Sequence, residues 1–138
     1  MKILTTSICA LILSTASLIA GETSKPKVNL LLSSGETILG QPITYPSGPA
    51  QVTTAIVTLP VGAQTGWHHH QVPLVGYMLE GELSVDYAEH GTRTYKAGEA
   101  VYEAIGTSHN GQNTGDVPVR ILVVFAGAQG VPNSVSDQ

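Results

Sequence analysis

The feature that most constrains the fold is a series of short runs of β-branched and aromatic residues, each ended by glycine, proline or asparagine. Residues 52–59, 74–79 and 119–125 are examples, and each run has the length of a single strand. Beyond the N-terminal segment, no window shows an apolar stripe with the helical period of about 3.6 residues. With 138 residues, the chain has room for one domain. We predict that this domain is all-β, a sandwich or a closed barrel.

The N-terminal segment has the layout of a secretory signal peptide. A positive start at Lys2 is followed by residues 3–19, which are uncharged and mostly apolar, and then by Gly21. We predict a signal peptide over residues 1–20, with cleavage between residues 16 and 21. The chain would then be exported to the periplasm or, alternatively, secreted from the cell. An uncleaved membrane anchor is the other interpretation, which the short apolar core disfavours.

The rest of the chain divides into three parts. We predict that residues 21–50 form an N-terminal arm with two edge strands, at 28–32 and 37–45. Residues 51–127 carry the regular strand pattern and are predicted to form the barrel core. Residues 128–138 are mostly polar or turn-forming and are predicted to be a flexible tail.

Composition limits what can stabilise the chain and what it can bind. The single cysteine, Cys9, lies in the predicted signal peptide, so a mature chain has none. Its fold must then be held by core packing, a metal or a partner subunit. Six Lys and Arg against ten Asp and Glu give a formal charge of −4. This balance excludes a basic surface for nucleic acid or for anionic membranes, and small molecules remain as the expected ligands.

Histidine supplies the main chemical signal, in the run His68-His69-His70. On an extended strand, residues i and i+2 point to the same face, about 7 Å apart. His68 and His70 can therefore reach one ion, at about 2.0–2.1 Å from each imidazole nitrogen. His69 faces away, and we expect it to be a surface residue or to support a ligand from behind.

A third histidine, His109, lies between the turn residue Gly106 and Asn113. A stable metal site needs at least three protein ligands, and a barrel can bring His109 opposite His68 and His70. We therefore predict one divalent transition metal per chain, held by these three histidines. Imidazole suits several metals, so the choice among Zn, Fe, Ni, Cu and Mn stays open.

Both histidine segments resemble motifs of the cupin superfamily of small β-barrels. The first motif, G-x5-H-x-H-x3-E-x6-G, is followed except at Leu74, where the family has a carboxylate ligand. The second motif, G-x5-P-x-G-x2-H-x3-N, is followed except at Ala104, where proline is usual. The matching residues are Gly62, His68, His70 and Gly81 in the first motif and Gly98, Gly106, His109 and Asn113 in the second.

The resemblance implies a single cupin jelly-roll barrel, a divalent metal at the three histidines and a homodimer. It implies no particular reaction, because one fold hosts many chemistries. Without a carboxylate at Leu74, the ion keeps its full double charge and attracts anionic oxygen ligands more strongly.

Alternation along the strand that starts at Leu74 predicts a pocket beside the metal. Leu74, Gly76 and Met78 share its inner face, where leucine is apolar, glycine leaves space and methionine is pliable. With Asn113 from the second motif, they are expected to line a dry pocket for a planar or partly apolar ligand. The alternative for Gly76 is that it only relieves packing inside the barrel.

Few other residues suggest chemistry. Glu103, near the second motif, is the candidate catalytic residue, as an acid or base or as a partner of a histidine. The alternative is a solvated strand residue. We expect Tyr87 and Tyr95 on the outer face or at an interface, and Trp67 at the barrel mouth.

Two classes of function remain. In the first, the protein is a metal-dependent dioxygenase or a related oxidoreductase, and its small substrate chelates the metal through an enolate, catecholate or thiolate. In the second, it is a non-enzymatic module that binds or senses a small ligand and carries a structural metal. The sequence contains no Ser-His-Asp order and no phosphate-binding glycine loop that would point to another class.

Overall fold

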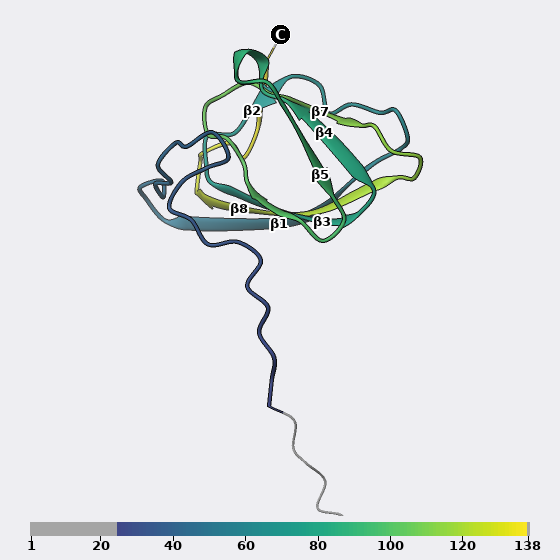
Figure 1. The fold of residues 1–138 in the computed structure, drawn as a ribbon. Helices are drawn as coiled ribbons and strands as arrows, with labels where there is room; N and C mark the ends of the chain where they lie inside the picture. Colours follow the sequence, from purple (N-terminus) through teal and green to yellow (C-terminus); the bar gives the residue numbers. More distant parts are fainter. Residues whose placement is uncertain (1–24, 138) are drawn as a thin grey trace, which may run out of the picture.

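The computed structural model describes residues 25–137 and shows an all-β fold (Figure 1). The predicted signal peptide and Cys9 lie outside these residues. The strands are β1 (Ala50–Leu59), β2 (His68–His69), β3 (Leu74–Glu80), β4 (Glu82–Asp86), β5 (Thr92–Lys96), β6 (Ala100–Tyr102), β7 (Asn110–Asn113), β8 (Val119–Ala128) and β9 (Val135–Ser136). A 3-10 turn, η1 (Ala88–His90), is the helical element of the described residues, and among them no helix has the length and apolarity to cross a membrane. The all-β prediction is confirmed.

Two sheets face each other and form the jelly roll. The larger sheet has the strand order β1-β8-β3-β6 and the smaller the order β5-β4-β7, while β2 and β9 form a short separate pair. β1 and β8 pair antiparallel along their whole length, from Ala50 opposite Ala128 to Leu59 opposite Val119. Figure 1 shows these long strands along one side of the barrel, with β4 and β5 across from them.

The core lies between the sheets and follows the period-two alternation of the strands. On β8, Val119, Ile121 and Val123 are buried, while the residues between them are partly or fully exposed. The turn from β3 to β4 depends on Gly81, whose φ is +81°. A Cβ atom there would lie 2.8 Å from the carbonyl oxygen of Pro118, so only glycine fits this crossing between the sheets.

The N-terminal arm differs from the prediction. Residues 28–32 form no strand, and in place of a strand over 37–45 there is one isolated bridge, between Glu36 and Pro42. The nearest sheet edge, β6, has only three residues. It offers the arm a backbone hydrogen bond of 2.8 Å from the Ile38 amide to the Tyr102 carbonyl oxygen. Such a short edge does not support further strands, so the prediction of two edge strands is wrong.

The C-terminal tail differs in the opposite sense. β9 pairs antiparallel with β2, and Val135 lies opposite His69. The Asp137 amide donates a hydrogen bond of 2.9 Å to the Trp67 carbonyl oxygen. The tail thus pairs with the backbone edge of β2. The prediction of a flexible tail over 128–138 is therefore wrong.

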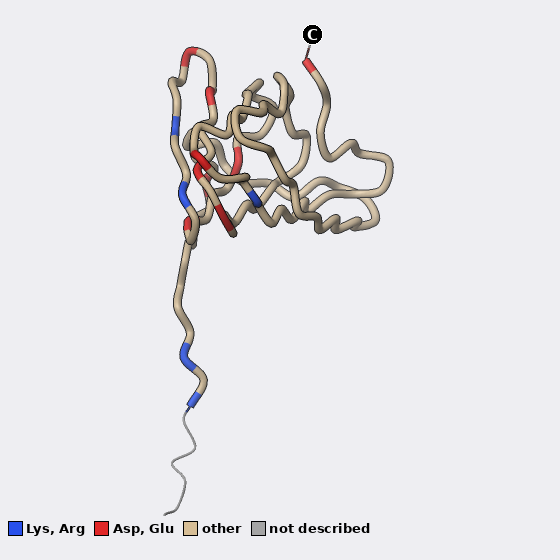
Figure 2. The backbone as a smooth tube through the Cα atoms, turned by 90° about the vertical axis from the view of Figure 1, so that its right-hand side faces the viewer, with Lys and Arg blue, Asp and Glu red and all other residues tan. Residues whose placement is uncertain are grey.

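Charged side chains are few and dispersed over the molecule. Figure 2 shows Lys and Arg on the arm, on β5 and on β8, at Lys25, Lys27, Arg93, Lys96 and Arg120. Acidic residues lie between these positions. Over residues 25–137, the basic side chains therefore do not gather into one surface, in agreement with the expectation from the net charge.

Candidate metal centre

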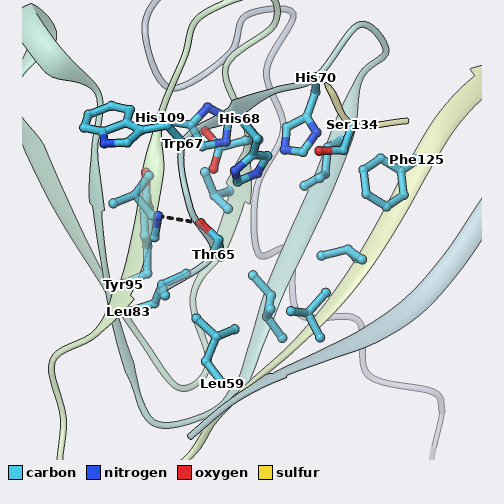
Figure 3. Close-up of a pocket in the computed structure, with 18 of the residues that line it drawn as sticks. Leu59, Thr65, Trp67, His68, His70, Leu83, Tyr95, His109, Phe125 and Ser134 are labelled. Atoms are coloured by element: carbon cyan, nitrogen blue, oxygen red, sulfur yellow. Dashed lines mark hydrogen bonds between the residues drawn. The ribbon is translucent and has the colours of Figure 1, made fainter. Parts of the chain in front are cut away.

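Three histidines converge at one end of the barrel. A ring nitrogen from each of His68, His70 and His109 lies within 4.8 Å of the other two, and the ring centroids are 4.5 to 5.0 Å apart. Figure 3 shows the three rings grouped above a pocket. The structure thus brings together the three histidines that the sequence singled out.

Backbone pairing between distant segments holds the three residues in place. The His68 amide donates to the His109 carbonyl oxygen at 3.0 Å, and the His109 amide donates back to His68 at 2.8 Å. The Gly106 amide donates to the His70 carbonyl oxygen at 2.8 Å. These bonds tie β2 and the residue that follows it to the loop before β7, so that both motifs meet at one site.

Hydrogen bonds also orient each ring. The Nδ1 atoms of His68, His70 and His109 lie 2.8, 2.9 and 2.9 Å from the carbonyl oxygens of Gly66, Asn133 and Thr107. Because a carbonyl oxygen only accepts, each Nδ1 must carry the hydrogen. Each Nε2 atom then keeps its lone pair, which is the tautomer that a metal ligand requires.

Burial favours the neutral form of two of these imidazoles, those of His68 and His70. His70 and His109 are only 4% and 2% exposed, and His68 is half-buried. Loss of hydration lowers the pKa of His68, and it lowers the pKa of His70 to about 4. At neutral pH both rings are therefore uncharged and able to donate a lone pair.

The donor set fits a divalent transition metal. Three neutral imidazoles are the protein ligands of several zinc enzymes, and imidazole also binds iron, nickel and copper. No Asp, Glu or Cys of the described residues joins the cluster. A metal held here would have open coordination positions for water or for another small ligand.

An open pocket adjoins the histidines. Its volume is about 480 Å³, and it extends from the histidines to Leu59 and Leu83 at the opposite end (Figure 3). Most of its wall is aliphatic or aromatic, and no Lys or Arg of residues 25–137 lines it. Thr65, Glu103 and Ser134 supply polar atoms, and Trp67 stands at the mouth as predicted. The pocket suits a ligand with an apolar body.

Only part of the predicted pocket lining is correct. Leu74 lines the pocket, whereas Met78 is 1% exposed in the core and does not line it. A Cβ atom on Gly76 would lie 3.0 Å from side-chain atoms of both Ile121 and Val101. Gly76 therefore relieves packing between strands, which was the alternative interpretation, and it leaves no space beside the histidine cluster.

Asn113 is a structural residue and does not line the pocket. Its Nδ2 donates to the carbonyl oxygens of Leu59 and Val117 at 3.0 and 2.9 Å. Its Oδ1 accepts from the Gly115 amide at 3.0 Å. This 1% exposed amide pairs otherwise unsatisfied backbone groups at the end of β7, so the prediction of a pocket residue is wrong.

Glu103 is buried beside the pocket rather than solvated. It is 8% exposed and lines the cavity, and its Oε1 accepts from the Ala104 amide at 2.7 Å. Its side chain approaches two tyrosines, Tyr87 and Tyr95, whose hydroxyl oxygens are 3.0 Å apart. Glu103 is thus placed to contact a ligand, although it is not part of the histidine cluster.

The two tyrosines lie inside the barrel, contrary to the prediction of an outer face. Tyr87 is fully buried, its ring centroid is 5.6 Å from that of His109, and Tyr95 lines the pocket. Burial raises the pKa of Tyr87 far above its usual value, and it raises the pKa of Tyr95 to about 12. Both phenols therefore stay protonated and serve as hydrogen-bond donors.

His69 and the tail complete the surroundings of the site. The Nδ1 of His69 lies 2.8 Å from Oδ1 of Asp137, away from the cluster, as the alternation of the strand predicts. Ser134 and Ser136 line the pocket. Neither serine was predicted from the sequence, because β9, which contains Ser136 and directly follows Ser134, has only two residues.

Several solved structures resemble this one. The Lactobacillus farciminis oxalate decarboxylase, in a complex with formate, is 27% identical with a TM-score of 0.53, and the match covers 62% of this chain and 26% of that one. The DMSP lyase DddQ from Ruegeria pomeroyi DSS-3 is 25% identical with a TM-score of 0.53, and the match covers 62% and 42%. BH2720 from Bacillus halodurans, at 22% identity and a TM-score of 0.52, supports the fold alone. The matched segment spans less than half of either enzyme.

Sequence comparison assigns the family. No curated protein sequence matches the chain significantly. A sequence profile described as "Cupin domain" matches residues 55–125, which is more than half of the chain and includes all three clustered histidines. The jelly roll and both histidine motifs agree with this match, and the chain therefore belongs to the cupin family.

Proposed function

We propose that this protein is an exported, metal-dependent oxidoreductase of the dioxygenase type. It would bind one divalent transition metal through His68, His70 and His109 and act on a small, mainly apolar substrate that chelates the metal. The observation that carries this proposal is the opening of the three-histidine cluster into an apolar pocket of about 480 Å³.

The open site favours catalysis over a structural metal. Structural zinc sites are closed by four protein ligands, whereas catalytic sites keep at least one position for water or substrate. Here the cluster has three histidines, and the position of the family's carboxylate ligand is occupied by Leu74, which faces the pocket. A substrate oxygen or sulfur would complete the coordination.

The pocket indicates the chemical class of the substrate. Its wall is mainly aliphatic and aromatic, and it contains one carboxylate, Glu103, but no Lys or Arg. A small dicarboxylate such as oxalate would leave most of the volume empty and would find no cationic side chain in the wall. An aromatic or enolic molecule with one chelating end would fill the pocket and bury its apolar body.

The side chains of this chain have separate roles in the proposed reaction. The three histidines hold the metal, which supplies Lewis-acid polarisation of coordinated oxygen atoms when bound. The carboxylate of Glu103 accepts the proton of the substrate's chelating hydroxyl. The hydroxyl of Tyr95 donates a hydrogen bond toward the ligand, and the apolar wall excludes water.

A second candidate function is a non-enzymatic module that binds or senses a small ligand. Two observations favour it. Oε1 of Glu103 already accepts a hydrogen bond from the Ala104 amide, and burial raises the pKa of both Tyr87 and Tyr95. Few groups in the pocket are then free to transfer a proton. In this case the metal would only coordinate the ligand and would not take part in a reaction.

The names of the similar proteins support an enzymatic role. Two of them are a decarboxylase and a lyase. Neither name describes an oxygen-dependent reaction, so the reaction class proposed here rests on the donor set and the pocket of this chain.

Oxygen uptake distinguishes the two candidates. Protein loaded in turn with Fe(II), Cu(II) and Zn(II) is mixed with a catechol, an enolic β-diketone or a thiol, and oxygen consumption is recorded. Uptake by the iron or copper form, absent from the zinc form and from His109→Ala, supports the oxidoreductase. Saturable binding of a probe compound without oxygen uptake in any metal form supports the binding module. If no probe binds and no oxygen is consumed, the proposed ligand site is contradicted.

We further propose export to the periplasm and assembly as a homodimer. Export is supported by the uncharged residues 3–19 after Lys2. Fractionation with intact-mass measurement tests it, and a cytoplasmic product that retains residues 1–20 would contradict it.

The homodimer is supported by apolar side chains that a single copy leaves in solvent. Val28 and Leu30 of the arm are 88% and 79% exposed, and Val52 and Ile56 on β1, an edge strand, are 64% and 51% exposed. A second copy would cover both surfaces. Light scattering after removal of residues 22–32 should report a monomer, and an unchanged mass would contradict this contact.

A further inference from the structure

The three clustered histidines are not oriented in the same way. His68 and His109 each contact a carbonyl oxygen two residues earlier, at Gly66 and Thr107, within their own turns. His70 contacts the carbonyl oxygen of Asn133, which is 63 residues later. Only the orientation of His70 therefore depends on a remote segment of the chain.

That remote segment is docked by contacts of its own. β9 pairs with β2, and the Asp137 amide donates to the Trp67 carbonyl oxygen at 2.9 Å. The side chain of Asp137 accepts from Nδ1 of His69 at 2.8 Å. The side chain of Asn133 packs against β8, where a Cβ on Gly127 would lie 3.2 Å from its Oδ1.

The side chains of the run His68-His69-His70 thus point to both faces of the extended chain. His68 and His70 point to the cluster, while His69 points the other way and binds Asp137. β2, which carries His68 and is followed directly by His70, therefore also holds the tail. The tail in turn places its carbonyl oxygen against His70 and lines the pocket with Ser134 (Figure 3).

We propose that residues 133–137 are a positioning element of the metal site, which fixes the tautomer and the orientation of His70. This inference rests on the metal site of the proposed function, but not on its reaction. Loss of an outer hydrogen-bond partner of a histidine ligand typically lowers metal affinity by about 10- to 100-fold. We expect a loss of this size when the tail is removed, because His70 becomes free to rotate or to change tautomer.

The test compares two deletions in the otherwise complete protein. One variant ends at residue 132, and the matched control lacks residues 22–32 of the arm. Zinc affinity is measured by competition with a chelator, and the ring tautomers of the metal-free proteins are measured by long-range ¹H–¹⁵N NMR at pH 7. The tail deletion should weaken zinc binding by about 10- to 100-fold, while the arm deletion should leave it unchanged.

The NMR measurement separates positioning from a general loss of structure. In the tail deletion, His70 should lose its single tautomer with hydrogen on Nδ1, whereas His68 and His109 should keep theirs. A full-length variant, Asp137→Ala, should shift the tautomer population of His70 in the same direction by a smaller amount. This variant replaces the deletion if the deletion does not fold. Unchanged zinc affinity and tautomer in both variants would overturn the inference, and so would an equal effect on all three rings. If the wild-type protein bound no metal, the proposed function would fail, whereas the tautomer of His70 would still test the tail.

Discussion

The mouth and the floor of the pocket are held by different forces. At the mouth, each clustered histidine has a backbone carbonyl oxygen as a partner, at 2.8 to 2.9 Å. At the floor, the aliphatic side chains of Leu59 and Leu83 are held by packing in the core (Figure 3). Hydrogen bonds fix the direction of a ring, whereas packing fixes volume. Changes at the mouth should therefore alter metal binding, and changes at the floor should alter stability and pocket size.

The largest effect is expected at the mouth. His68→Ala, His70→Ala and His109→Ala should each abolish stoichiometric metal binding, because a site with two protein ligands does not retain the ion. Metal content after gel filtration measures this. His90→Ala, on the exposed turn η1, is the control and should bind one ion per chain. Full binding by any two of the three cluster variants would show that the ligands are wrongly assigned.

The metal-free protein should lose stability in acid because of His70. Its pKa is about 4 in the fold and near 6.5 in the unfolded chain, so the unfolded state binds more protons between these values. Stability should fall as the pH drops from about 6.5 toward 4, by roughly 3 kcal/mol in total. Urea unfolding across this range measures it. His70→Leu should show a shallower slope, and an identical slope would contradict the assignment.

At the floor, Leu83→Ala should lower the free energy of unfolding by about 2 kcal/mol, the low end for leucine, because the side chain already borders a cavity. Zinc affinity should stay within about twofold of the wild type, since no bond at the mouth changes. Leu79→Ala, at a 39% exposed position, is the matched control and should have a smaller effect. A large loss of zinc affinity in Leu83→Ala would erase the distinction between mouth and floor.

The smallest effect is expected where the two regions meet. Leu74→Glu restores a carboxylate at the family position and should slow metal release to a chelator by about tenfold, which corresponds to about 1.4 kcal/mol. Leu74→Gln, which has the same length without the charge, is the control. Equal release rates in both variants would mean that residue 74 does not face the ion.

Local sequence patterns predicted the fold class and the cluster. Strand runs ended by glycine and proline give an all-β chain, and spacing alone puts His68 and His70 on one face. His109 required the assumption that a barrel closes, and the backbone bonds between His68 and His109 show how it does. Each of these signals is carried by residues close together in the sequence or by the family motifs.

Contacts between distant segments were not predictable in the same way. The tail docks through a strand of two residues, too short for any periodicity, and Asp137 binds a histidine far from it in sequence. Tyr87 is buried because the connection between β4 and β5 places its ring 5.6 Å from that of His109, which its own neighbours do not reveal. The arm has strand-like composition but lies against β6, an edge of only three residues, so propensity alone misjudged it.

The central claim is that one ion binds among the three imidazoles, and anomalous X-ray diffraction from crystals of the metal-loaded protein tests it most directly. We expect a single peak with the Nε2 atoms of His68, His70 and His109 at about 2.0–2.1 Å and with the pocket side of the ion open. A peak bound by other residues, or no peak between the rings in crystals that contain the metal, would contradict the account.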